Sequence, residues 1–134
     1  MKFIKRISLQ SAVLINITII LIAILVHSLI IFQVLPYTWV SGGFSPTFEM
    51  QKQISVISTM ILCVTIPINL LAYKKILKKK LVIVLKILLY ILFAYFFFGF
   101  FMQLLGTIFE RTLMSILCLL SAIMYLRLAI EKNS

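Results

Sequence analysis

The chain has 134 residues, of which 63% are hydrophobic, and its mean hydropathy is +1.21. Soluble domains are roughly half apolar, so this composition excludes a soluble protein and predicts one all-α domain, residues 1–134, within a membrane. A formal net charge of +10 can indicate nucleic-acid binding, but the bases lie at the edges of apolar segments, so we expect no nucleic-acid partner.

The first apolar segment, residues 7–35, predicts a membrane-spanning helix. It follows a basic start, as in a signal peptide, yet it is longer than a signal peptide's apolar region and no small-residue cleavage site follows it. We therefore expect a retained span. Pro36 should end it, because proline cannot continue a hydrogen-bonded helix.

His27 is the one histidine of the chain and lies inside this first segment. It shares a helical face with Asn16, and that face should turn toward other helices because lipid-exposed imidazoles and amides are costly. One interpretation is a proton relay or ligand contact shared with Asn16 or Asn69. The other is a neutral ring hydrogen-bonded to another helix, which the lack of an acid inside the apolar segments favours.

The connection at residues 36–46 is the least generic segment of the chain. Tyr37 and Trp39 suit the membrane interface, which accommodates an apolar ring with a polar edge. Gly42 and Gly43 permit backbone conformations barred to other residues. The loop is either a lid or docking surface facing out of the cell, or a tight turn anchored by its aromatic residues, and we favour the turn.

The second apolar segment, residues 46–73, has the most polar helical face of the chain. It should begin with Ser45 as its cap and Pro46 in its first turn. Pro67 lies within it and should kink the helix. The candidate polar interior combines the first two segments: Asn16, His27, Ser55, Thr59 and Asn69.

Two connections carry an acid beside a base, Glu49 with Lys52 and Glu110 with Arg111. Together with Gln53 and Gln103, the two acids could form a polar cluster at the outer ends of the helices. Their separation in the sequence argues against such a cluster. The position of Glu49 in the first turn of its helix is already explained by the helix dipole.

Two further apolar segments, residues 81–105 and 112–130, predict the third and fourth helices. A basic cluster precedes the third: Lys74, Lys75, Lys78, Lys79 and Lys80. These lysines either bind anionic lipid headgroups or only orient the chain during insertion, and we favour orientation. The fourth segment has small residues along one face, as transmembrane helices use for packing.

The distribution of charge predicts the topology. Of the thirteen bases, eleven lie with one acid on one side of the apolar segments, and two lie with two acids on the other. Short loops rich in Lys and Arg stay in the cytoplasm. We therefore predict an antiparallel bundle of four transmembrane helices in a bacterial plasma membrane, with both termini cytoplasmic. The expected partners are the lipid bilayer and a membrane protein or second copy, with no cofactor.

Four short motifs stand out along the chain: Pro36-Tyr37 with Trp39, Gly42-Gly43, Gly106, and Leu126 to Glu131. Together they resemble a group of small four-span membrane proteins from Gram-positive bacteria. That group has no assigned activity, so the resemblance implies an architecture and no function. The group carries an arginine after the glycine pair, where this chain has Phe44.

Two functions remain open. The first is a non-enzymatic accessory, immunity or envelope-related protein that acts through partners, which fits the lack of a reactive set of side chains. The second is a transporter of a small molecule or amphipath that works as an oligomer through the polar interior. We expect no enzyme, because membrane enzymes usually carry His, Asp and Glu clusters near one interface and this chain has one histidine and three acids.

Overall fold

The computed structural model describes residues 2–40, 46–80 and 82–131, and the regular elements within these ranges are all helical. Four of the helices are long and apolar enough to cross a membrane, as the sequence predicts. In chain order the elements are α1 (Lys2–Lys5), α2 (Leu9–Ile31), the 3-10 turn η1 (Tyr37–Trp39), α3 (Phe48–Leu77), α4 (Ile83–Leu104), the π-helical turn η3 (Glu110–Met114) and α5 (Ser115–Ala129).

Helix α2 ends earlier than predicted, and Pro36 does not end it. The helix stops at Ile31, and Gln33 takes a left-handed backbone conformation with φ of 62°. The N–H of Val34 then donates to the carbonyl of Leu29 at 2.8 Å. This is the Schellman arrangement, which usually has glycine at the left-handed position. Here that position is Gln33, so no glycine marks this helix end in the sequence.

Helix α3 begins later and ends later than predicted. Its cap is Thr47, whose Oγ1 accepts from the N–H of Met50 at 3.3 Å, so Pro46 precedes the helix; Ser45 lies outside the described residues. The helix continues through Pro67 to Leu77, beyond the predicted end at residue 73. It closes with the same left-handed turn, at Lys79 with φ of 55°.

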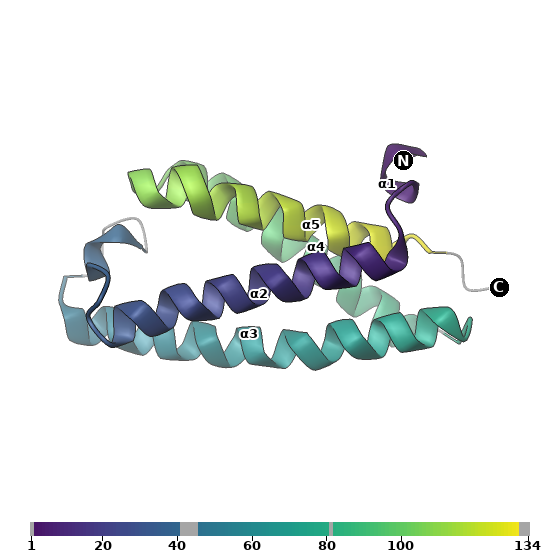
Figure 1. Cartoon of the computed structure of the whole chain (residues 1–134), viewed down its shortest axis with the longest axis horizontal. Helices are drawn as coiled ribbons and strands as arrows, with labels where there is room; N and C mark the ends of the chain where they lie inside the picture. The colour runs from purple at the N-terminus through teal and green to yellow at the C-terminus, as the bar shows by residue number, and fades with distance from the viewer. Residues whose placement is uncertain (1, 41–45, 81, 132–134) are drawn as a thin grey trace.

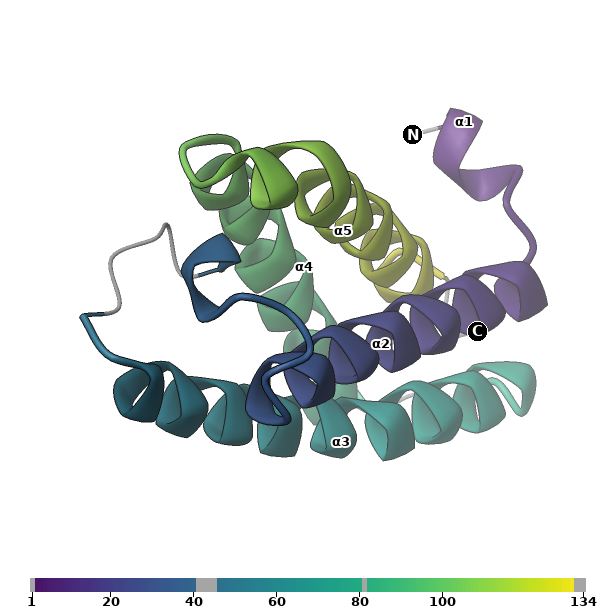
Figure 2. The same cartoon turned by 60° about the vertical axis from the view of Figure 1, so that its left-hand side comes forward.

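The helices pack as two antiparallel hairpins, α2 with α3 and α4 with α5, and α2 also packs against α5. Figures 1 and 2 both show that the two ends of the bundle differ. We call the end with α1, Lys78–Lys80 and the end of α5 the lysine end. The other, with residues 32–40 and 105–109, is the loop end.

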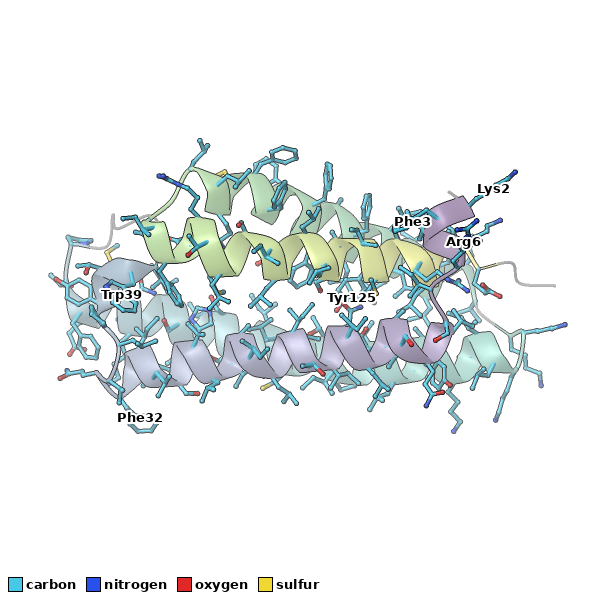
Figure 3. The ribbon with its side chains drawn as sticks, turned by 45° about the horizontal axis from the view of Figure 1, so that its top comes forward. Lys2, Phe3, Arg6, Phe32, Trp39 and Tyr125 are labelled. Atoms are coloured by element: carbon cyan, nitrogen blue, oxygen red, sulfur yellow. The ribbon has the colours of Figure 1, made fainter. Side chains whose placement is uncertain are left out.

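The bundle is not closed on all four sides. Among the residues that the structure describes, α3 and α4 make few contacts with each other. Figures 1 and 2 show α4 leaning away from α3 toward the loop end. The packed core instead lies nearer the lysine end, where Tyr125, Leu89 and Ala12 are fully buried. Figure 3 shows Tyr125 in this interior, with Trp39 at the loop end and Arg6 at the lysine end.

Candidate functional site: a cavity between α3 and α4

The divergence of α3 and α4 leaves a cavity of about 500 Å³. Helices α2 and α5 form its back wall, and its lining is mostly isoleucine, leucine, phenylalanine and methionine. Ile61 of α3 and Tyr95 and Phe98 of α4 lie on its rim with 50%, 62% and 67% of their surface exposed. The cavity therefore opens sideways between the two helices rather than along the bundle axis.

The segment after α2 closes the cavity at the loop end. Val40 lines the cavity and packs with Val26 and Ile30. The Trp39 ring lies 5.4 Å from the Phe109 ring, and the Thr107 hydroxyl donates to the carbonyl of Trp39. These contacts, which we call the loop-end closure, bind the connection after α2 to the turn before α5.

The structure favours an anchored turn over a free lid for the described part of this connection. Tyr37 packs edge-on against Phe48 of α3, with ring centroids 6.3 Å apart. Trp39 is anchored as described above. The predicted residues Gly42 and Gly43 lie outside the described residues.

His27 lines the cavity and is hydrogen-bonded to helix α3. Its Nδ1 lies 3.1 Å from Oγ of Ser55, which also accepts from Nε2 of Gln51 at 3.1 Å. The Ser55 hydroxyl can accept from Gln51 and donate its own hydrogen to Nδ1 of His27, which satisfies both hydrogen bonds. In this arrangement the imidazole ring carries its hydrogen on Nε2. The partner of His27 is thus a serine on another helix, and not Asn16 or Asn69.

Among the described contacts, the Thr59 side chain hydrogen-bonds only within its own helix. Its Oγ1 donates to the carbonyl of Ser55, four residues earlier on the same helix, at 2.8 Å. Hydroxyls often bond to their own helix in this way. Ser55 itself is fully buried.

Glu110 is 5% exposed and lines the cavity near the loop end. Its Oε1 accepts from the backbone N–H of Thr107 at 3.4 Å and lies 3.3 Å from the Thr107 hydroxyl, whose hydrogen is donated to the carbonyl of Trp39. Gly106 makes room for it, because a Cβ at Gly106 would lie 2.9 Å from Cδ of Glu110. Glu110 is the first residue of a π-helical turn, whereas the sequence predicts an ordinary helix that starts at residue 112. Such turns are frequent at functional sites.

The predicted cluster of two acids and two glutamines forms only in part, because Gln53 is exposed on α3 and does not line the cavity. Gln103 and Glu110 both line the cavity. Glu49 is exposed in the first turn of α3 and does not line the cavity. Among the described residues, Oε1 of Gln103 is buried without a hydrogen-bond partner.

Asn16 and Asn69 belong to a second polar group, which joins three helices. Nδ2 of Asn16 donates to Oδ1 of Asn69 at 3.1 Å, and Nδ2 of Asn69 donates to the Tyr125 hydroxyl at 2.9 Å. Ser121 donates to Oδ1 of Asn16 at 2.9 Å. All four residues are fully buried. The predicted polar interior is therefore divided into two groups, and Ser121 and Tyr125 were not predicted to belong to it.

The lysine cluster lies at the lysine end of α3 and in the residues that follow it. Lys74, Lys78, Lys79 and Lys80 are exposed, and Lys75 is half-buried. Arg127 at the same end is 7% exposed, donates to the carbonyl of Ile7 at 2.6 Å and pairs with Glu131 at 2.7 Å. Binding of lipid headgroups by the lysines stays a prediction.

No protein-family model, curated protein or solved structure matches this chain. Within the described residues, no three His, Cys, Asp or Glu side chains are grouped so that they could hold a metal ion. Among the described residues, the cavity and its polar groups are the features that point to a function.

Proposed function

We propose that the protein is a non-enzymatic integral membrane protein that binds an amphipathic molecule in the cavity between α3 and α4. The observation that carries the proposal is the cavity itself, which is largely apolar and about 500 Å³ in volume. Small-molecule sites are commonly about 300–1,000 Å³ with a few polar groups on an apolar lining. Its sideways opening would give a molecule dissolved in the bilayer direct access.

In this proposal the bundle axis lies along the membrane normal and the lysine end faces the cytoplasm of a bacterial cell. The support is the collection of α1 and Lys78–Lys80 at one end of the bundle, since short basic segments stay inside. Both termini would then be cytoplasmic, and the cavity would open into the outer leaflet.

Binding accounts for the geometry better than transport does. A transporter needs a route to the opposite membrane surface. Beyond the cavity, toward the lysine end, the hydrogen bonds among Asn16, Asn69 and Tyr125 join three helices instead. At the other end Val40 lines the cavity, and Trp39 is held against Phe109 and Thr107. A bound molecule could therefore enter and leave through the gap between α3 and α4 without crossing the membrane.

The environment of His27 supports a binding role rather than catalysis. An acid–base catalyst needs a pathway for protons and commonly an orienting acid, whereas the described partner of Nδ1 is the Ser55 hydroxyl. The accessory, immunity or envelope role suggested by composition fits a protein that holds a ligand and passes its presence to a membrane partner.

Filling the cavity tests the proposal. Ser58 lines the cavity and is half-buried, whereas the neighbouring Ile57 is 58% exposed and does not line it. In nanodiscs, a long-chain fatty alcohol with a mid-chain diazirine should label cavity residues, and excess unlabelled alcohol should compete. We expect S58F to reduce this competed labelling about tenfold or more, because its ring occupies the cavity, and the matched I57F to leave it unchanged.

Mapping the labelled residues by mass spectrometry decides the outcome. Competed labelling of α3 and α4 at the cavity, lost in S58F, supports binding. Labelling spread evenly over exposed apolar residues, or insensitive to competitor, contradicts it. Competed labelling only at an interface between two copies would also contradict it, because the gap would then be covered by a second chain.

A further inference from the structure

We infer that the ligand carries a neutral hydroxyl head group, which the Gln103 amide binds at the loop end of the cavity while a single apolar chain extends along α4. This inference rests on the proposed function and adds the chemistry of the head group. It begins from one group that the fold leaves unsatisfied.

The unsatisfied group is Oε1 of Gln103, which is buried without a partner in the part of the chain that the structure describes. Leaving a buried acceptor unpaired is unfavourable, and native structures seldom retain one without a reason. Gln103 lines the cavity, and the terminal torsion of glutamine has broad preferences. A modest rotation of the amide would present Oε1 to a donor entering the cavity.

A hydroxyl matches the amide better than a charged head group does. An amide offers one acceptor and one donor group, and a hydroxyl both donates and accepts. Moving an ion into an apolar site is far less favourable than moving a hydroxyl. An anionic head group would also approach Glu110, a carboxylate that lines the same end of the cavity.

The length of the cavity matches one chain of one leaflet. On α4 its lining extends from Ile91 to Gln103, twelve residues apart, which is about 18 Å at about 1.5 Å per residue. The hydrocarbon core of a bilayer is about 30 Å thick, so one leaflet contributes about 15 Å. A chain whose hydroxyl lies at Gln103 would therefore end near Leu92 and Ile91, about halfway along α4.

The experiment compares head groups on one chain. In nanodiscs, labelling of the cavity by the diazirine alcohol is competed with a fatty alcohol, its methyl ether and the corresponding fatty amine, all of equal chain length. We expect the alcohol to compete about tenfold better than the ether, which accepts but cannot donate. In Q103L this preference should disappear, because leucine removes the amide at similar volume. The control is M102L, which keeps the amide beside it and should keep the preference.

The outcomes separate this inference from the proposed function. Cavity labelling with equal competition by alcohol and ether, or a preference that survives in Q103L, would overturn the hydroxyl head group while leaving ligand binding intact. Stronger competition by the amine would overturn it too and would point to Glu110. Absence of competed cavity labelling would overturn both. Thermal unfolding of Q103L and M102L should match the native protein, since neither change removes a protein hydrogen bond among the described residues.

Discussion

Asn69 uses one carboxamide to contact two other helices. It accepts from Asn16 of α2, donates to the Tyr125 hydroxyl of α5, and also donates to the carbonyl of Thr65 at 2.8 Å. Buried polar groups in a bundle are most useful when every member has a partner. Here the amide links α2, α3 and α5 and so fixes their register.

Replacing Asn69 should therefore destabilise the bundle. Hydrogen bonds between membrane helices are worth about 0.6–1.7 kcal/mol each, and N69L leaves Asn16 and Tyr125 without this partner. We expect N69L to lower the free energy of unfolding by about 1–2 kcal/mol, measured by reversible unfolding in mixed micelles. The control is L71A, at a position 47% exposed, which should change it little. Native stability of N69L would show that the network holds the helices only weakly.

Gly106 and Glu110 lie close together in the turn before α5. A Cβ at position 106 would lie only 2.9 Å from Cδ and from Oε1 of Glu110, which is too close for a side chain there. Thr107, between them, donates to that carboxylate from its backbone N–H, while its hydroxyl donates to Trp39. The Gly106 motif seen in the sequence thus has a steric explanation in the turn before α5.

At the element scale, the loop-end closure ties the two hairpins together. Trp39 contacts Phe109 and accepts from Thr107 through its carbonyl, so the segment after α2 is bound to the turn before α5. Aromatic pairs of this kind contribute about 0.5–1.5 kcal/mol beyond their buried area. The ring contact and the hydrogen bond together therefore stabilise the packing of the two hairpins at the loop end.

Removing the Trp39 ring should expose the loop end of the cavity. Cys118 lines the cavity, and Cys63 is an exposed free thiol, so the test uses a Cys63→Ser background. We expect W39A to raise the rate at which a small water-soluble thiosulfonate modifies Cys118 by several-fold. W39F, which keeps a ring against Phe109, should react at nearly the native rate. Equal rates in W39A and the native protein would mean that the closure does not control access.

The ends of α2 and α3 share a second element-scale feature. Both helices close with a left-handed residue that is not glycine, Gln33 in one and Lys79 in the other. Left-handed conformations are unfavourable for side chains with a Cβ. They persist here because the following N–H groups satisfy carbonyls of the last helical turn, as Val34 does for Leu29 and Lys80 does for Lys75.

For the whole molecule, the testable consequence is its orientation in the membrane. Lys79 and Glu49 are both exposed, at opposite ends of α3. In a Cys63→Ser, Cys118→Ser background, a membrane-impermeant thiol reagent added to intact cells should label E49C and not K79C. Permeabilised cells should show labelling of both, which controls for reactivity. Labelling of K79C in intact cells would reverse the proposed topology.

Much of the architecture follows from local properties of the sequence. Each long helix can be recognised because about twenty apolar residues are needed to cross a bilayer as a helix. The buried faces also follow from spacing, since Asn16, Ala23 and Ile30 are seven residues apart and are all buried. The helix ends do not follow as well, because Gln33 and Lys79 carry no signal for a left-handed turn.

The candidate site was predictable in its parts but not in its arrangement. Sequence reasoning selected His27, Gln103 and Glu110 for their chemistry, and all three line the cavity. Spacing along one helix does not determine which residues of another helix it meets. The sequence alone therefore could not show that His27 contacts Ser55, or that Asn69 belongs to a different polar group from these two residues. Ser121 and Tyr125, four residues apart on a small-residue face of α5, were a usable sign of a polar contact.

By itself, the sequence determines four helices long and apolar enough to span a membrane, and which face of each is polar or small. These properties depend on hydropathy and on residues three or four apart, which are local. Only the tertiary structure decided that α4 leans away from α3 and leaves a cavity of about 500 Å³. The tilt of a helix depends on side-chain packing between segments distant in the sequence, here Leu89, Phe96 and Tyr125.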